Sequence, residues 1–189
     1  MIKQVLFVQG AGEGVHDRWD NKLVDSLQRE LGDGYAVRYP RMPGEHDPGY
    51  AAWKAALIDQ FAALEDGAIL VGHSVGGTIL LRVLAEHPPK ATIDGLFIIA
   101  APFIGEGGWP SDDIDPRQDL AKELPPRVSI HLYHGTDDSD VPTAHVRLYA
   151  KAIPQAVVRA LDGKDHQLNN DMSEVARDIC SVGQASSRE

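Results

Sequence analysis

The sequence predicts an α/β protein, a three-layer α/β/α sandwich around about six mainly parallel strands. Short apolar runs rich in β-branched residues alternate with longer stretches in which apolar residues recur every three or four positions. The short runs are apolar throughout, which is typical of strands buried on both faces of a parallel sheet. Strands that alternate with helices also imply right-handed crossovers, with helices on both faces of the sheet.

The strands are expected at six apolar runs: Val5–Val8, Tyr35–Tyr39, Ala68–Val71, Ile93–Ala100, Val128–Tyr133 and Val157–Leu161. Between the first two runs Leu23, Leu27 and Leu31 recur every four residues, and Gly32 then provides a helix stop signal. Further helices are expected at Pro48–Leu64, from Ser74 to just before His87, at Thr143–Ala152 and at Asp171–Val182.

Length and composition fit one such domain. The chain has 189 residues, of which 43% are hydrophobic and 24% charged. We expect a single domain over residues 1–182 and a frayed polar tail over residues 183–189. No run approaches the ~20 apolar residues that a membrane-spanning helix needs.

The charge and the cysteine content limit the classes of partner. A formal net charge of −10 repels phosphate backbones and anionic lipid surfaces, so we expect no nucleic-acid partner and no membrane partner. Cys180 is the single cysteine, which fits a reducing compartment and therefore a cytoplasmic location. Cys180 lies in an apolar-periodic segment, so we expect a buried structural thiol.

The segment Gly72-His73-Ser74-Val75-Gly76 matches the pattern G-x-S-x-G. It directly follows an apolar strand and opens an amphipathic helix, which is the setting of a nucleophile elbow. In such a turn the serine hydroxyl points clear of the sheet, and glycines leave room where the chain passes close by. The Val75 N–H would then face a developing oxyanion. The alternative is a glycine-rich turn whose serine only caps the helix.

An acidic turn over residues 134–142 follows the fifth predicted strand. A nucleophile elbow requires an acid and then a histidine later in the chain. Asp138 is the predicted acid, since two residues separate it from Val141-Pro142 and this arrangement resembles the acidic turn of known α/β hydrolases. Asp137 and Asp140 are the alternatives, although either of them would also suit the cap of the next helix.

His166 is the predicted general base. It lies in a loop after the sixth strand, and that strand itself follows the acidic turn. Catalytic groups gather at the carboxyl ends of parallel strands, so Ser74, Asp138 and His166 should converge. The other histidines fall inside the elbow, in or at the end of a strand, or outside the required order: His16, His46, His73, His87, His131, His134 and His145.

A glycine-rich loop, Gly10–Gly14, follows the first strand. Its spacing is not that of a dinucleotide fingerprint, and the next helix starts too late for one. We expect it to supply the second oxyanion donor, with the Ala11 N–H as the candidate and Gly12 as the alternative. A plain surface turn is the remaining interpretation. No metal-ligand spacing is present, so neither a metal nor a cofactor is expected.

Together these features resemble the α/β-hydrolase superfamily, and in particular the small single-domain serine hydrolases related to retinoblastoma-binding protein nine. The elbow and the acidic turn are general to that superfamily, while the Tyr39–Pro43 segment and the compact length point to the subgroup. The resemblance implies a shortened hydrolase sheet, a Ser74–Asp138–His166 triad and esterase-like activity. One departure is Asp165, which stands where relatives often carry glycine; a carboxylate beside the base would raise the pKa of the base if close enough.

The chain is too short between Ala101 and Pro126 for a large cap domain, so we expect a shallow or loosely covered site. Phe103 and Trp109 are candidate walls of a substrate pocket, or else aromatics that pack this loop down. The predicted function is a serine hydrolase acting on small ester or related acyl substrates. The alternatives are amide, thioester or lactone cleavage on the same triad, and a non-enzymatic binding protein. The oligomeric state stays open.

Overall fold

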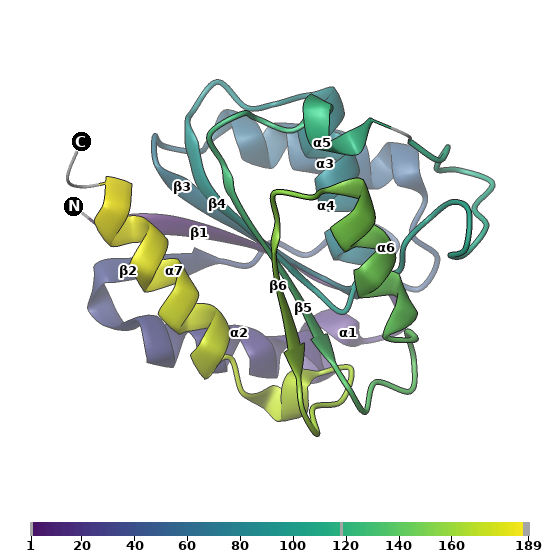
Figure 1. The fold of residues 1–189 in the computed structure, drawn as a ribbon. Coiled ribbons are helices and arrows are strands. Elements are labelled where there is room, and N and C mark those ends of the chain that lie inside the picture. The colour runs from purple at the N-terminus through teal and green to yellow at the C-terminus, as the bar shows by residue number, and fades with distance from the viewer. Residues whose placement is uncertain (1, 118, 187–189) are drawn as a thin grey trace.

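The protein is described here by a computed structural model that covers residues 2–117 and 119–186. Six strands form a single sheet in the order β2-β1-β3-β4-β5-β6, and every pairing is parallel (Figure 1). The strands are β1 (Lys3–Val8), β2 (Tyr35–Arg38), β3 (Ala68–His73), β4 (Ile93–Ile99), β5 (Ser129–Gly135) and β6 (Val157–Leu161). The predicted fold class is confirmed.

Helices cover both faces of the sheet, with α2 and α7 on one face and α3, α4 and α6 on the other (Figure 1). The helices are α1 (Val15–Arg18), α2 (Asp20–Leu31), α3 (Tyr50–Ala62), α4 (Ser74–Glu86), α5 (Leu120–Glu123), α6 (Ala144–Ala152) and α7 (Ser173–Ser186). Short 3₁₀ turns follow α2 at Gly32–Gly34 and precede α7 at Leu168–Asn170. The two four-residue helices were not predicted.

Each face of the sheet has its own apolar core. Trp53, Leu70 and Leu80 belong to the cluster beneath α3 and α4. Phe7 and Leu27 belong to the cluster beneath α2 and α7. Because β1, β3, β4 and β5 are buried on both sides, the carboxyl ends of these strands are held in fixed relative positions.

The C-terminal helix is longer than expected. α7 continues to Ser186, so residues 183–186 are helical rather than part of a tail, and residues 187–189 of the predicted tail lie outside the described residues. At Gly183 a Cβ atom would lie 2.7 Å from the Tyr35 hydroxyl, so glycine at this position lets the helix pass close to β2. Cys180 is only partly buried, against the core beneath α7.

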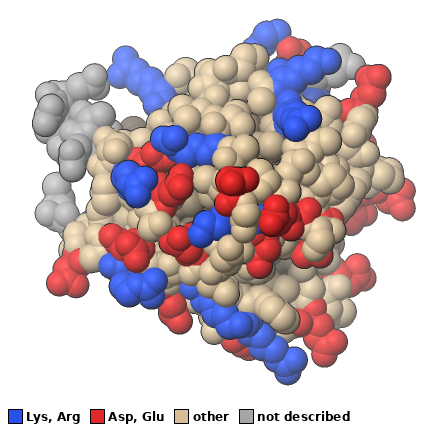
Figure 2. All heavy atoms as spheres, turned by 60° about the horizontal axis from the view of Figure 1, so that its bottom comes forward, with Lys and Arg blue, Asp and Glu red and all other residues tan. Residues whose placement is uncertain are grey.

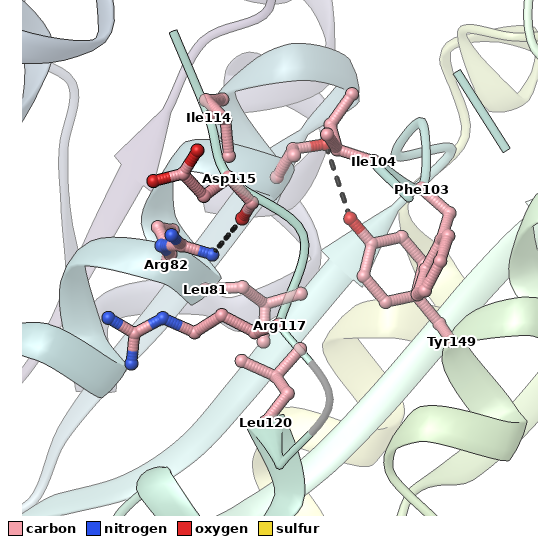
Figure 3. Close-up of a pocket in the computed structure, with 10 residues that line it drawn as sticks. Leu81, Arg82, Phe103, Ile104, Ile114, Asp115, Arg117, Leu120 and Tyr149 are labelled. Atoms are coloured by element: carbon pink, nitrogen blue, oxygen red, sulfur yellow. Dashed lines mark hydrogen bonds between the residues drawn. The ribbon is translucent and has the colours of Figure 1, made fainter. Parts of the chain in front are cut away.

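The connection from β4 to β5 stays close to the body of the protein. His145 Nδ1 accepts a hydrogen bond from the Phe103 N–H at 2.8 Å, and Arg82 on α4 donates to the carbonyl oxygen of Asp115. Figure 3 shows the small cavity beneath this connection, with Tyr149 on one side and Arg82 on the other. Its volume of about 30 Å³ is close to that of one water molecule. The connection therefore packs against the helices instead of forming a separate cap.

In the part of the chain that the structure describes, no helix has the length and hydrophobicity needed to cross a membrane.

Candidate active site

The elbow places Ser74 at the tip of a sharp turn between β3 and α4. Ser74 has a left-handed backbone, with φ at +52°, which is uncommon for a residue with a side chain and costs free energy. The neighbouring glycines permit the turn. A Cβ atom at Gly76 would lie 1.8 Å from the Gln9 carbonyl oxygen, and one at Gly72 would lie 2.6 Å from the Gly77 Cα. These chain segments can approach each other so closely only because Gly72 and Gly76 have no side chains.

Ser74, His166 and Asp138 form one hydrogen-bonded chain. The His166 Nε2 lies 3.0 Å from the Ser74 Oγ, and its Nδ1 lies 2.9 Å from the Asp138 Oδ2. The three side chains come from the segments that follow β3, β5 and β6. Of the three aspartates considered from the sequence, Asp138 is the one whose carboxylate bonds to this imidazole. Neither Asp137 nor Asp140 caps α6, which begins without a side-chain cap.

Asp138 is held as an ionised carboxylate. Its side chain is fully buried, and burial alone would raise its pKa. Hydrogen bonds from His134, from His166 and from the Val141 N–H outweigh burial and place the pKa of Asp138 below its usual range. The Oδ1 atom accepts from the N–H groups of Asp140 and Val141 at 2.9 and 2.8 Å. The acid is therefore fixed in both charge and orientation.

Asp165 does not turn toward the imidazole. Its Oδ1 accepts hydrogen bonds from the Gln167 N–H at 3.0 Å and the Asn169 N–H at 2.7 Å. The Asp165 carboxylate thus stabilises the loop that carries His166.

The loop after β1 leaves one N–H group available beside Ser74. The Gly10 N–H donates to Asp20 Oδ2 at 2.7 Å, and the Gly12 N–H donates to the Glu45 carbonyl at 2.6 Å. Between them, the Ala11 N–H has no partner among the described residues, and Ala11 lines the cavity that contains Ser74. Gly12, the alternative donor, is therefore already engaged.

A cavity of about 450 Å³ opens at Ser74 and His166. Trp19 and Trp109 form part of its wall, and both are substantially exposed. Phe103, the second predicted wall residue, does not line this cavity. Its ring packs edge-on against Tyr149 with the centroids 5.0 Å apart, because its main chain is turned inward by the bond to His145. Of the two predicted pocket aromatics, the structure brings only Trp109 to the cavity at Ser74.

Several polar residues of the site were missed from the sequence. Asp20 and His73 are buried behind Ser74, and His134 Nε2 lies 3.2 Å from Asp138 Oδ2. The Glu45 side chain accepts from the N–H groups of Gly14 and His16 and so holds the loop after β1 from outside. The one feature of the sequence that could have pointed to these residues is His73, a histidine at the variable position of the elbow.

One group of potential metal ligands coincides with the same site. Single ligand atoms of Asp138, Asp140 and His166 lie within 4.8 Å of one another. Both ring nitrogens of His166 already face Asp138 and Ser74. A metal ion here would therefore compete with the hydrogen-bonded chain.

The surface toward the carboxyl ends of the strands carries mixed charge. Figure 2 brings this side of the molecule forward and shows Lys and Arg interspersed with Asp and Glu. A nucleic-acid footprint is typically a continuous basic stripe. On the face shown in Figure 2 the basic side chains do not form such a stripe.

The comparisons with known proteins identify the family. Residues 5–160 match the model of the alpha/beta hydrolase family. The chain belongs to this family. The matched segment includes Ser74 and Asp138 and ends before His166, so the assignment of the base depends on the geometry.

Individual relatives of this alpha/beta hydrolase are distant. It is 27% identical over 178 residues to a pimeloyl-[acyl-carrier protein] methyl ester esterase of Neisseria meningitidis, covering 87% of this chain and 66% of that protein. Among solved structures, the ydeN gene product from B. subtilis has a TM-score of 0.76 at 21% identity, covering 95% of this chain and 98% of that one. A serine hydrolase without lid from Xanthomonas campestris has a TM-score of 0.66 at 18% identity, covering 98% and 83%. The structural likenesses establish the fold.

Proposed function

We propose that this alpha/beta hydrolase is a serine esterase, with Ser74 as nucleophile, His166 as general base and Asp138 as the orienting acid. The observation that carries the proposal is the hydrogen-bonded chain from the Ser74 Oγ through both ring nitrogens of His166 to Asp138. The distant esterase relative supports an ester as the substrate. The cavity volume is within the ~300–1,000 Å³ usual for small-molecule sites, which supports a small substrate.

The reaction is a two-step acyl transfer. The Nε2 atom of His166 takes the proton of the Ser74 hydroxyl while Oγ forms a bond to the ester carbonyl carbon. The carbonyl oxygen becomes an oxyanion, held by the N–H groups of Val75 and Ala11. When this intermediate collapses, the bond to the alcohol oxygen breaks and the alcohol takes the proton from His166. Water then attacks the acyl-enzyme with His166 again as base, which releases the acid and restores Ser74.

Asp138 has two tasks in this cycle. Its bond to Nδ1 keeps the proton on that nitrogen, so that Nε2 is free to accept the serine proton. Its negative charge also stabilises the imidazolium that forms during each step. The low pKa of Asp138 keeps that charge in place.

Covalent labelling tests the proposal. A fluorophosphonate probe followed by peptide mapping should modify Ser74, and p-nitrophenyl esters of increasing chain length should then define the acyl preference. Ser74→Ala should lose at least about 10³-fold in turnover while keeping its melting temperature. If that variant retains most of its ester hydrolysis, Ser74 is not the nucleophile.

A wider set of substrates and the same fluorophosphonate probe separate the alternative functions. Amide, thioester and lactone substrates tested beside the esters distinguish other acyl chemistry on the same three residues. A binding protein on this fold would leave the probe unreacted. No cofactor takes part in the proposed cycle. We also propose a cytoplasmic, reducing location, on the ground of the single Cys180.

A further inference from the structure

A second Asp–His pair lies directly behind the catalytic one. His73, the residue before the nucleophile, has its Nδ1 atom 3.0 Å from the Asp20 Oδ2. The two side chains are 1% and 0% exposed. Asp20 opens α2, and His73 ends β3, so the pair joins two segments that are 53 residues apart. The proposed reaction uses neither side chain.

The contacts of this pair reach the loop after β1 and the loop that carries His166. Asp20 Oδ2 accepts the Gly10 N–H of the oxyanion loop at 2.7 Å. His73 Nε2 lies 2.9 Å from the main-chain oxygen of His166 itself. Asp20 Oδ1 also accepts from Gln167 Nε2 at 3.2 Å, on the loop of the base. A single buried pair therefore ties together the segments after β1, β3 and β6.

The hydrogen bonds determine the charge of His73. One ring nitrogen faces a carboxylate oxygen and the other faces a carbonyl oxygen, and neither oxygen can donate. The lowered pKa of Asp20 favours its ionised form, and with Asp20 ionised both nitrogens donate, so that His73 is an imidazolium paired with the Asp20 carboxylate. Burial works to lower the pKa of His73, but Asp20 outweighs it and raises that pKa, while the pKa of Asp20 is lowered.

The pair also sets the electrostatics around the base. The rings of His73 and His166 are 4.9 Å apart, so a lone charge on His73 would oppose the positive charge that His166 acquires during catalysis. Asp20 neutralises His73 and removes this opposition. The bond from Gly10 to Asp20 meanwhile fixes the loop so that the next N–H, that of Ala11, stays free beside Ser74.

We propose that Asp20 and His73 are positioning residues for the esterase reaction, which hold the nucleophile, the base and the oxyanion loop in register through one buried ion pair. This inference rests on the proposed function of Ser74. Asp20 acts through Gly10 and His73, and His73 acts through the main chain of His166. Neither side chain is assigned a bond to the substrate.

The test compares two buried carboxylates. Asp20→Asn keeps the shape of the side chain and removes its charge. Asp178→Asn is the matched control, because Asp178 is also buried and accepts from Tyr133 and Arg159, in a cluster between β5, β6 and α7 that does not touch the active site. For each variant kcat, KM, the fluorophosphonate labelling rate and the melting temperature are measured.

Asp20→Asn should lower kcat and the labelling rate together by about 10- to 100-fold, with KM changed by less than about 3-fold. Asp178→Asn should lose thermal stability but keep a kcat close to that of the unaltered protein. The inference is overturned if Asp20→Asn keeps full kcat and labelling, or if both carboxylate variants lose activity only in proportion to their lost stability.

A measurement on the unaltered protein covers the case in which Asp20→Asn does not fold. In ¹⁵N-labelled protein, the His73 ring should show protons on both nitrogens at neutral pH, with its signals assigned by their absence from His73→Gln. A neutral His73 tautomer would contradict the proposed ion pair. Failure of the unaltered protein to label at Ser74 would instead remove the proposed function and leave the NMR result standing.

Discussion

Asp138 differs from its two acidic neighbours in what surrounds its side chain. Asp137 and Asp140 are exposed, whereas the Asp138 carboxylate is fully enclosed and accepts hydrogen bonds from two histidines and from two main-chain N–H groups. An exposed carboxylate would exchange between water and the imidazole. The enclosed one has a fixed bond to His166 Nδ1, which supports the proposal that Asp138 alone orients this imidazole.

Replacement of Asp138 and of Asp137 by asparagine tests which aspartate orients His166. Asp138→Asn should lower kcat by about 10³- to 10⁴-fold, because an amide at this position favours the wrong imidazole tautomer. Asp137→Asn is the control and should leave kcat within about 2-fold, because among the described residues its carboxylate bonds only to Thr136. Steady-state kinetics with a p-nitrophenyl ester measures both. Equal losses in the two variants would mean that the acid is misassigned.

The two aromatics of the β4–β5 connection should also respond differently. Trp109→Ala removes part of the wall of the catalytic cavity and should raise KM several-fold for hydrophobic esters, with a smaller change in melting temperature. Phe103→Ala should instead cost about 3 kcal/mol of stability through lost packing against Tyr149, with KM unchanged. Kinetics and thermal melts of the pair decide whether Phe103 belongs to the pocket after all.

At the scale of elements, the approach of α4 to the end of β1 is the tightest contact around the nucleophile. Gly76→Ala would place a methyl carbon 1.8 Å from the Gln9 carbonyl oxygen, so main chain must move. We expect a loss of about 3 kcal/mol or more, or roughly 6 °C or more in melting temperature, together with loss of activity.

Gly49→Ala is the matched control for that substitution. Gly49 caps α3 with a negative φ of −72°, and a Cβ atom there meets nothing within 4 Å. The cost should be within about 1 kcal/mol. Thermal melts of both variants provide the comparison, and equal losses in the two variants would show that the clash at Gly76 does not explain the effect.

The helix α2 could be predicted from the sequence because its burial is periodic, and Leu23, Leu27 and Leu31 are all buried. The run Val157–Leu161 matches β6 at both ends, but β6 is an edge strand in which only Leu161 is buried, so the expectation of burial on both faces is wrong for this strand. The helices α1 and α5 were missed because four residues are too few to show a period. β3 and β5 extend two residues past their predicted ends, because His73, His134 and Gly135 remain paired although they break the apolar run.

The sequence predicted the site residues whose order along the chain is fixed by the fold, and it did not predict the others. Ser74, Asp138 and His166 follow the carboxyl ends of β3, β5 and β6, so their convergence follows from the topology of a parallel sheet. Asp20 gives no such signal. Its partners Gly10, His73 and Gln167 are 10, 53 and 147 residues away, and an aspartate at a helix start is ordinarily a cap.

At the scale of the whole molecule, acid should destabilise the protein through its paired carboxylates. Burial would raise the pKa of Glu86, but Lys54 and Arg82 lower it to about 2. Lys164 likewise lowers the pKa of Asp171 to about 2. The unfolded chain binds protons at these groups at a higher pH than the folded protein does. Their stabilisation is therefore present above the unfolded pKa and is lost as pH falls toward 2.

We therefore expect the melting temperature to fall steadily between about pH 5 and pH 2. We also propose that residues 1–182 form one domain, in which case unfolding at each pH is a single transition, because both cores share one sheet. Glu86→Gln should lower the melting temperature at neutral pH and flatten its pH dependence. Calorimetry across this range measures both effects, and two separate transitions would contradict the single domain.

The main-chain oxygen of His166 has a consequence for protein engineering. A transplanted triad is usually specified by three side chains, yet here the base is also anchored through its own backbone, by the neighbour of the nucleophile. A scaffold given only the serine, the histidine and the acid would leave that oxygen to bind water, and the imidazole would sample several positions. The smallest set to graft from this protein therefore has five members, because Asp20 and His73 must accompany the other three side chains. A library that keeps Asp20 and His73 constant should yield active clones more often than a library in which both vary.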